Sequence, residues 1–357
     1  MKIGIIGFTQ AGKKTLFEII TQHKITENEI GSGKPIEGIA KIIDPRFEKL
    51  AIMYKPEKLV RARINIVLLP DFEQDSLLNE IVAKEINTID ALCHVVRQFE
   101  SDSVYHVKGS VDAKRDIDEI NSELILSDLM FIEKRLERIE KNLKRSNDPI
   151  AIKEKEFLLK LKEHLNTEKP LRLLEIGQEE KKIISGYPFV TLKEMVVVLN
   201  VSEKDIKNTE MIEKFKKDYE HLNIYFMHIS AKIESEIAAF ESEQEKKEFL
   251  DATGIEEPAV DVLKRVCIKA LNLISFFGVG SDEVKQWTIR AGSTAPNAAG
   301  AIHSDLEKGF IKAEVMKYDE LITYGSEEKL KEAGKYYLKG KDYIVEDGDI
   351  LGIRFNV

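Results

Sequence analysis

A loop near the start of the chain has the residue types and spacing of a phosphate-binding site. Gly7 to Lys13 reads G-F-T-Q-A-G-K, which matches the first seven positions of the motif G-x-x-x-x-G-K. In such a loop, successive backbone N–H groups and the positive end of the following helix hold a polyphosphate, and the lysine reaches its β- and γ-phosphates. The alternative is a glycine-rich turn with a solvated Lys13. The predicted phosphate end of the site consists of Gln10, Ala11, Gly12, Lys13, Lys14 and Thr15.

The eighth position of the motif departs from the pattern. A serine or threonine hydroxyl should follow the lysine and bind Mg²⁺, but this chain has Lys14 there. Thr15 is no direct substitute, because one step along a helix turns a side chain by about 100°. Lys14 either neutralises phosphate charge in place of the metal or extends into solvent. The sequence therefore offers no metal ligand here, and binding of Mg²⁺ is doubtful.

A second requirement is an aspartate at the end of a neighbouring strand, usually in D-x-x-G, which holds the metal shell and senses the γ-phosphate. The corresponding strand ends I-V-L-L-P-D over residues 66–71. In the register that we expect, Leu68 takes the place of the aspartate and Asp71 that of the glycine. A carboxylate would then face the γ-phosphate and weaken triphosphate binding relative to diphosphate binding. The sequence identifies no catalytic residue.

Two further strand ends carry residues suited to a nucleobase. N-V-S-E at Asn200 to Glu203 takes the place of N-K-x-D, whose aspartate pairs with guanine. Val201 and Glu203 depart from this guanine-binding motif, so adenine is the better prediction for the base. Ser230, Ala231 and Lys232 fit an S-A-K loop that closes over the base. The predicted base-binding residues are Asn200, Val201, Glu203, Ser230 and Ala231.

These residues need a parallel sheet to bring them together. Short apolar runs without helical period predict buried strands at residues 2–6, 63–69, 91–96, 195–199 and 224–229. Helix-like segments lie between them, including one at 14–21 with apolar residues on one face. Strands that alternate with helices predict a doubly wound α/β domain.

Two other segments have a different pattern of residues. From Val111 to Glu180, charged residues and leucines recur at helical spacing and are interrupted at 147–149, which predicts a helical hairpin inserted in the sheet domain. It is either a solvated arm or a partner-binding arm. After Gly254 we expect a helix at 260–277, another at 298–306, and a turn at 347–349 between strands, which together predict a small mixed α+β domain.

The composition limits the function classes. Net charge is −9, which argues against a protein that coats nucleic acid with its whole surface, although a local basic patch can still meet RNA. No apolar run reaches the roughly 20 residues of a membrane span, and no signal pattern opens the chain, so we expect no membrane contact and a cytoplasmic location. Cys93 and Cys267 sit in apolar surroundings and are expected to be buried thiols.

The chain resembles the YchF type of Obg-like ATPases over essentially its whole length. The matching segments are residues 1–7, 200–203, 254–258 and 284–288, and above all 295–305, 307–311 and 341–345. The resemblance implies a P-loop G-domain at 1–110 and 183–280, an inserted helical coiled-coil hairpin at 111–182, and a C-terminal TGS domain of β-grasp fold at 281–357. It also implies a preference for ATP over GTP and association with the ribosome.

The departures from this family gather around the metal. The family loop reads G-x-P-N-V-G-K-S-T, where this chain has Thr9, Gln10, Ala11 and Lys14, and the family switch D-I-A-G-L-V-K-G is absent. We therefore predict a protein that binds ATP or ADP with impaired or lost hydrolysis and contacts the ribosome or RNA through its hairpin and TGS domain. The alternatives are an active ATP hydrolase, with Asp71 orienting the metal, and a nucleotide-free interaction scaffold.

Overall fold

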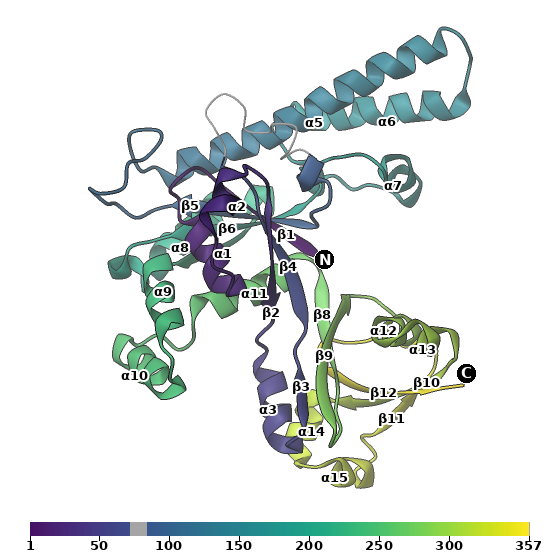
Figure 1. The fold of residues 1–357 in the computed structure, drawn as a ribbon. Helices are drawn as coiled ribbons and strands as arrows, with labels where there is room; N and C mark the ends of the chain where they lie inside the picture. Colours follow the sequence, from purple (N-terminus) through teal and green to yellow (C-terminus); the bar gives the residue numbers. More distant parts are fainter. Residues whose placement is uncertain (72–83, 357) are drawn as a thin grey trace. The chain divides into compact units, whose positions relative to one another are not determined.

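The computed structural model describes residues 1–71 and 84–356 (Figure 1). The chain divides into two compact units, one of Met1–Ile39 with Asn65–Leu263 and one of Ala40–Ile64 with Lys264–Val357. Each unit contains one six-stranded sheet. The second unit includes residues 40–64, which the sequence places in the first domain, and the predicted boundaries near 110, 182 and 280 stay a prediction.

The sheet of the first unit has the strand order β2-β4-β1-β5-β6-β7 (Figure 1). Its strands are β1 (Lys2–Ile6), β2 (Ile36–Lys41), β4 (Arg63–Leu68), β5 (Ala91–Arg97), β6 (Glu194–Asn200) and β7 (Tyr225–Ile229). The pairs β1–β4, β1–β5, β5–β6 and β6–β7 are all parallel. This confirms the predicted α/β fold. Because parallel neighbours carry their loops at the same edge, the segments after β1, β4, β5, β6 and β7 come together.

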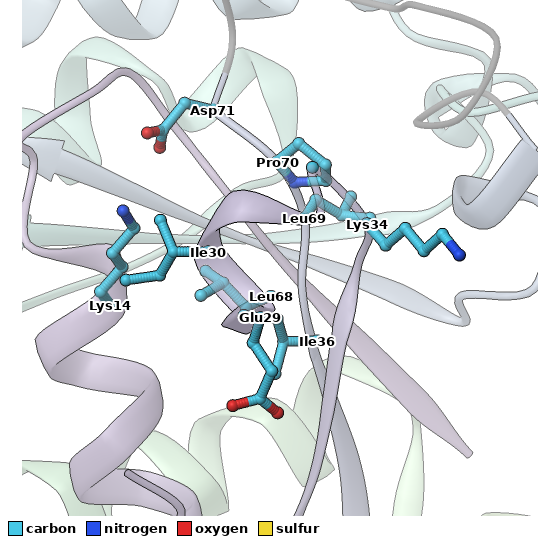
Figure 2. Close-up of a pocket in the computed structure, with 10 residues that line it drawn as sticks. Lys14, Glu29, Ile30, Lys34, Ile36, Leu68, Leu69, Pro70 and Asp71 are labelled. Atoms are coloured by element: carbon cyan, nitrogen blue, oxygen red, sulfur yellow. The ribbon is translucent and has the colours of Figure 1, made fainter. Parts of the chain in front are cut away.

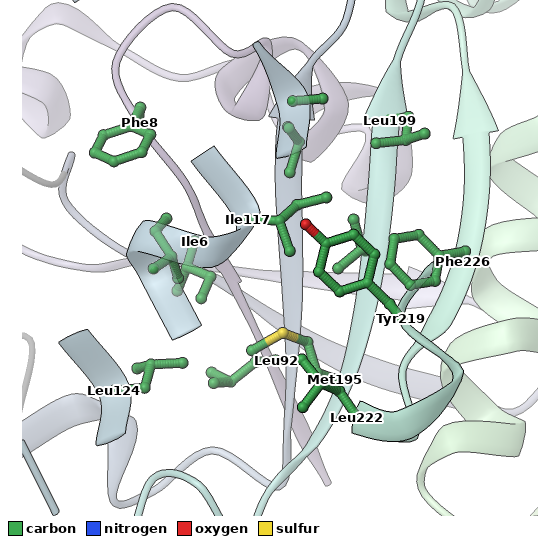
Figure 3. Packing of buried hydrophobic residues seen from close by; sticks show 14 of the residues in the cluster. Ile6, Phe8, Leu92, Ile117, Leu124, Met195, Leu199, Tyr219, Leu222 and Phe226 are labelled. Carbon is green, nitrogen blue, oxygen red and sulfur yellow. The ribbon is translucent and has the colours of Figure 1, made fainter. Parts of the chain in front are cut away.

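The helices of this unit include α1 (Lys13–Thr21), α2 (Glu27–Gly31), α8 (Thr209–Asp218), α9 (Ala231–Ala239) and α10 (Glu243–Thr253), and α11 (Ala259–Ala270) follows them. The helices α1, α8 and α9 carry buried apolar residues, whereas α2 and α10 have no buried residue. Figure 3 shows the core on one face of the sheet, where Leu92 and Met195 from the strands pack with Tyr219 and Phe226. Ile117, from the start of the inserted hairpin, belongs to the same cluster. The hairpin is therefore rooted in the core of the sheet domain.

The hairpin consists of α5 (Ala113–Leu143) and α6 (Pro149–Leu165), which run side by side away from the sheet (Figure 1). Asp112 and Asp148 cap the two helices by accepting hydrogen bonds from the backbone N–H groups of Arg115 and Ile150. Apolar side chains from both helices form a separate core, including Ile132, Leu136, Phe157, Leu158 and Leu161. Two long helices are found as predicted, but α6 begins at Pro149, within the predicted break at 147–149, and it ends at Leu165 rather than near Glu180. Two short elements follow it, a 3-10 turn (Leu171–Leu173) and α7 (Gln178–Ile184).

The second unit has a mixed sheet of order β11-β10-β12-β8-β9-β3. The strands are β3 (Lys58–Val60), β8 (Leu273–Gly278), β9 (Glu283–Arg290), β10 (Phe310–Lys317), β11 (Tyr337–Lys339) and β12 (Asp349–Phe355). Five helices accompany them: α3 (Pro45–Tyr54), α12 (Ala295–Ile302), α13 (Ser304–Lys308), α14 (Tyr318–Tyr324) and α15 (Glu327–Glu332). Phe276 and Trp287 stack with ring centroids 5.3 Å apart at the edge of its core. This agrees with the predicted small α+β domain.

Three local predictions in this region were wrong. The helix predicted at 260–277 ends at Ala270, and a strand begins at Leu273 after Asn272 adopts a left-handed conformation (φ 52°). The helix predicted at 298–306 is two helices, because His303 between them is extended. The segment at 343–345, expected to be the strand before the turn at 347–349, forms a single bridge through Ile344.

Cys93 and Cys267 are both buried, as expected. No helix in the described part of the chain has the length and apolarity needed to cross a membrane.

Candidate functional site

The predicted phosphate loop occupies the turn between β1 and α1. Its backbone has positive φ at Gly7 (141°), Gln10 (59°) and Gly12 (98°). A Cβ atom at Gly7 would lie 2.3 Å from the carbonyl oxygen of Val95, and one at Gly12 would lie 2.2 Å from Nδ2 of Asn200. Both the dihedral angles and the close contacts therefore require glycine at these two positions. Gly7 and Gly12 therefore fix the path of the chain from β1 into α1.

Lys13 points back under the loop and is only 3% exposed. Its Nζ donates hydrogen bonds to the carbonyl oxygens of Gly7 and Phe8, the latter at 2.6 Å, and lies 2.7 Å from Oδ1 of Asp71. Burial lowers the pKa of Lys13, and the neighbouring Asp71 carboxylate opposes that shift. The lysine predicted to reach the phosphates is thus held at the centre of the loop by three acceptors.

His94 lies directly beneath this loop, on β5. It is 1% exposed, its Cδ2 lies close to Gly7, and neither ring nitrogen has a hydrogen-bond partner in the described part of the chain. Burial, helped by the positive charge of Lys13, lowers the pKa of His94 to about 3. The imidazole is therefore neutral at physiological pH, and the floor of the loop carries no charge that would repel Lys13.

The neutral His94 should make the protein sensitive to acid. A histidine with a folded-state pKa of about 3 and an ordinary unfolded value near 6.5 binds fewer protons when folded, so the free energy of unfolding falls as pH drops from about 6.5 towards 3. The slope should approach about 1.4 kcal/mol per pH unit. A His94→Leu variant should lose this part of the pH dependence, as measured by urea denaturation at several pH values. Parallel curves for parent and variant would contradict the assignment, and His221→Leu, at an exposed histidine, is the matched control.

A first cavity of about 350 Å³ opens beside the loop, at the end of β4 (Figure 2). It is lined by Lys14, Glu29, Ile30, Gly33, Lys34, Ile36, Leu68, Leu69, Pro70 and Asp71. Leu68 is 4% exposed and pairs with Ile5 across the sheet, whereas Lys14 is exposed. Figure 2 shows the side chains of Lys14 and Asp71 extending into the same space. Residues 72–83, which would carry the rest of the switch, lie outside the described part of the chain.

The described residues that line this cavity do not supply the full set of oxygen ligands that Mg²⁺ requires. Lys14 and Leu68, which the motif register predicts at the hydroxyl and carboxylate positions, offer no side-chain oxygen, and the Asp71 carboxylate pairs with Lys13. The Glu29 carboxylate accepts hydrogen bonds from the N–H and Oγ1 of Thr26 at 2.8 Å each. Within residues 1–71 and 84–356, no three His, Cys, Asp or Glu side chains converge to hold a metal ion. The residues present therefore do not fit a conventional Mg²⁺ site.

A second, larger cavity of about 740 Å³ lies on the other side of the loop. Its lining includes Gly12, Thr15, Asn200, Val201, Glu203, Ser230 and Ala231, all of which the sequence singles out. These residues come from three separate segments that the parallel sheet brings to one edge. The volume falls in the range typical of small-molecule sites. Of the other predicted residues, Lys14 lines the first cavity and Gln10 is exposed on the loop.

Asn200 joins the phosphate loop to the loop at Ser230 and Ala231, which we call the base-side loop. Its Nδ2 donates to the carbonyl oxygen of Ala11 at 2.9 Å, and its Oδ1 accepts from the N–H of Ala231 at 3.0 Å. The side chain is 4% exposed, so both ends of the amide are satisfied inside the protein. In this structure Asn200 acts as a brace that positions two loops, and its predicted direct contact with a nucleotide stays a prediction.

Glu203 and Ser230 have different environments. The Glu203 carboxylate accepts a hydrogen bond from Lys232, which lowers the pKa of Glu203, and both side chains are largely exposed at the rim. The Ser230 hydroxyl is buried and has no hydrogen-bond partner among the described residues. A ligand in the cavity would find an ion pair at the rim and an unsatisfied hydroxyl at the base-side loop.

The sequence did not indicate one wall of this cavity, made by Phe99, Glu100 and Ser101. Arg97 shapes that segment by donating to the carbonyl oxygens of Phe99 at 3.1 Å and Val104 at 2.9 Å, and its guanidinium lies 4.6 Å from the Phe99 ring centroid. No motif marks these residues. The only available signal was that β5 neighbours β6, so the end of β5 must lie beside Asn200.

Comparison with known proteins gives full-length matches. A family model described as "YchF-GTPase_C: Protein of unknown function (DUF933)" matches residues 273–356. The chain is 39% identical over 363 residues to the ribosome-binding ATPase YchF of Bacillus subtilis, covering 99% of both chains. It is 36% identical to Obg-like ATPase 1 of Caenorhabditis elegans, covering 100% of this chain and 92% of that one.

Solved structures agree with these matches. The structure of the Schizosaccharomyces pombe YchF GTPase has a TM-score of 0.84 and 31% sequence identity to this chain, covering 99% of this chain and 97% of that one. A GTP-binding protein from Pyrococcus horikoshii, at 20% identity with a TM-score of 0.60, shares the fold over the full length of both chains.

Proposed function

Because this chain belongs to the family of YchF-type Obg-like ATPases, we propose that it binds ADP or ATP in its phosphate loop, with impaired or lost hydrolysis, and that it contacts ribosomes or RNA. The main support is the continuity of the site. The loop, whose path depends on Gly7 and Gly12, holds the buried Lys13. Asn200 bonds this loop and lines the cavity of about 740 Å³. Phosphates would lie on the loop N–H groups, and the base would lie in the cavity.

Adenine suits the base side better than guanine. Recognition of guanine requires a carboxylate that is available to accept from its N1–H and amino groups. The Glu203 carboxylate is already bonded to Lys232, and Val201 is 2% exposed and offers no polar group. Adenine presents no such pair of donors, so a pocket without an available carboxylate does not discriminate against it.

The chemistry of Lys14 and Leu68 supports the proposal of impaired hydrolysis. Phosphoryl transfer to water depends on charge stabilisation at the β- and γ-phosphates, which Mg²⁺ usually provides. A lysine and a leucine stand at the two positions from which the motif would coordinate the metal. An active hydrolase is the competing proposal, and it would require Asp71 to leave Lys13 in order to orient a metal ion.

The hairpin is the proposed point of contact with RNA, together with the C-terminal unit, which we take to be the TGS domain. At the end of α5 and directly after it, the side chains of Arg138, Lys141, Lys144 and Arg145 are exposed. A local basic cluster of this kind can meet the phosphate backbone of RNA even though the whole chain carries −9. The relative from Bacillus subtilis is named a ribosome-binding ATPase, which supports the same proposal and a cytoplasmic location.

Calorimetric titration with ADP, ATP and GTP, each with Mg²⁺ and with a chelator, tests the proposal. We expect ADP and ATP to bind with dissociation constants in roughly the micromolar range, ADP more tightly than ATP, and GTP to bind at least about tenfold more weakly than ATP. Removal of Mg²⁺ should change these constants by less than about threefold, because the site supplies no metal ligand. Phosphate release at the buffer rate would agree with lost hydrolysis. No binding of any nucleotide would refute the proposal and leave an interaction scaffold.

A further inference from the structure

The ammonium group of Lys13 has no donor left for a phosphate. A lysine ammonium carries three N–H donors and no acceptor. In this structure the three are directed to the carbonyl oxygens of Gly7 and Phe8 and to Oδ1 of Asp71, at 2.7 Å in the last case. The two carbonyls belong to the loop itself. Asp71 is therefore the only one of the three partners that a phosphate oxygen can replace without unfolding the loop.

Asp71 reaches Lys13 because of the order of the strands. It follows β4, which pairs directly with β1, and the Leu69 N–H donates to the Ile5 carbonyl oxygen at 3.1 Å. The chain therefore leaves the sheet next to the phosphate loop. The Asp71 side chain is 34% exposed and lines the first cavity, where Figure 2 shows it facing the same space as Lys14.

We propose that Asp71 is a built-in anion that competes with the terminal phosphate of a nucleoside triphosphate for Lys13, and that it makes this site selective for nucleoside diphosphates. The inference rests on the proposed nucleotide site and specifies its substrate class. It assigns to Asp71 a role in specificity rather than in catalysis.

The selectivity follows from where each phosphate would lie. The loop N–H groups and the start of α1 form a cradle that can hold a β-phosphate without moving Asp71. A γ-phosphate has to extend beyond that cradle towards Lys13, where the carboxylate now lies. The Asp71 carboxylate and the γ-phosphate are both negative and would repel each other beside Lys13. The triphosphate therefore either displaces Asp71 or binds more weakly because of this repulsion. The selectivity then comes from the Asp71 carboxylate, which repels the triphosphate and not the diphosphate.

Glu29 offers a matched control in the same cavity. Its carboxylate also lines the 350 Å³ space, but it is bonded to Thr26 and lies 3.0 Å from Nε2 of His23. Replacement of Glu29 by glutamine removes one negative charge from the cavity and leaves the Lys13–Asp71 contact in place. The two variants therefore separate a specific contact from a general change in potential.

The experiment measures the affinity of the full-length chain for ADP and for the non-hydrolysable β,γ-imido analogue of ATP, in the parent, Asp71→Asn and Glu29→Gln. In Asp71→Asn we expect the affinity for the analogue to rise at least about tenfold, with a change of less than about threefold for ADP. Glu29→Gln should change both by less than about threefold. Asp71→Ser serves as a second variant, and thermal unfolding of each confirms that it is folded.

The outcomes separate this inference from the proposed function. If the parent binds ADP and Asp71→Asn leaves the analogue unchanged, or improves both ligands equally, the role of Asp71 is refuted while the nucleotide site stands. An equal gain in Glu29→Gln would also refute it. If no folded variant binds any nucleotide, both proposals fail. If only the Asp71 variants bind the analogue, the built-in anion is supported in its strongest form.

Discussion

A Lys13→Ala variant is expected to bind ADP at least about 100-fold more weakly than the parent chain, as measured by calorimetric titration. Lys13 is the one buried cation of the loop, and its Nζ lies among the Gly7, Phe8 and Asp71 oxygens. A positive charge in such a water-poor position attracts the nearby phosphates more strongly than one at the surface, and it also neutralises the Asp71 carboxylate. Alanine removes that charge and leaves the phosphates facing the Asp71 carboxylate without compensation.

The neighbouring Lys14→Ala variant is the matched control. It removes the same charge from the next residue, but Lys14 is exposed and extends into the first cavity. We expect its affinity for ADP to fall by less than about fivefold. Thermal unfolding must show that both variants remain folded, since Lys13 also bonds the loop carbonyls. Parent-like binding of ADP by a folded Lys13→Ala variant would show that the nucleotide is not held by this loop.

Local sequence pattern was sufficient to predict the loop between β1 and α1. Gly7 and Gly12 are needed for the backbone angles and close contacts that the structure shows, and an apolar strand before them and a helix after them fix where the loop must lie. The hairpin was predictable for a similar reason. Its two helices bury their own apolar faces against each other, so the spacing of those residues is visible within a single stretch of sequence.

Contacts between distant segments were harder to foresee. The Lys13–Asp71 pair joins residues 58 positions apart, and its geometry depends on the place at which β4 ends beside β1. Asn200 was assigned to the base side by its motif, yet its amide holds the loop at Ala11 and Ala231. The wall at Phe99 has no motif at all, and only the neighbouring position of β5 and β6 brings it to the cavity.

The wrong helix at 260–277 shows a limit of periodicity. The apolar residues of α11 are followed by another apolar run at Leu273–Gly278, and short apolar runs fit a helix and a buried strand equally well. Pairing with β9 decides the outcome: six residues of β8 form an antiparallel ladder with it. Asn272 in a left-handed conformation permits the change of direction.

A Lys14→Ser, Leu68→Asp double variant is expected to gain Mg²⁺-dependent ATP hydrolysis, at least about tenfold above the parent rate. The substitutions replace the Lys14 ammonium by a hydroxyl and the apolar Leu68 side chain by a carboxylate, both in the lining of the first cavity. Both are oxygen ligands of the kind that Mg²⁺ prefers. The measurement is phosphate release with and without Mg²⁺.

The stability of the double variant gives a second readout that does not depend on catalysis. Leu68 is 4% exposed, so an aspartate at that position buries a charge, which is costly unless a cation pairs with it. Mg²⁺ together with a nucleotide should therefore raise the melting temperature of the double variant more than that of the parent. The single variant Lys14→Ser, which supplies only a hydroxyl, should show a smaller effect on both readouts.

The two readouts together identify the defect. If the melting temperature responds to Mg²⁺ and hydrolysis appears, loss of the metal ligands was the main reason for impaired turnover. If the metal stabilises the double variant but phosphate release stays at the buffer rate, Asp71 is the next group to change, because it still holds Lys13 away from the γ-phosphate. A triple variant that adds Asp71→Gly then tests whether a restored metal and an available lysine are sufficient. Buffer-rate release from that variant, with Mg²⁺ bound, would refute the metal-ligand explanation of impaired hydrolysis.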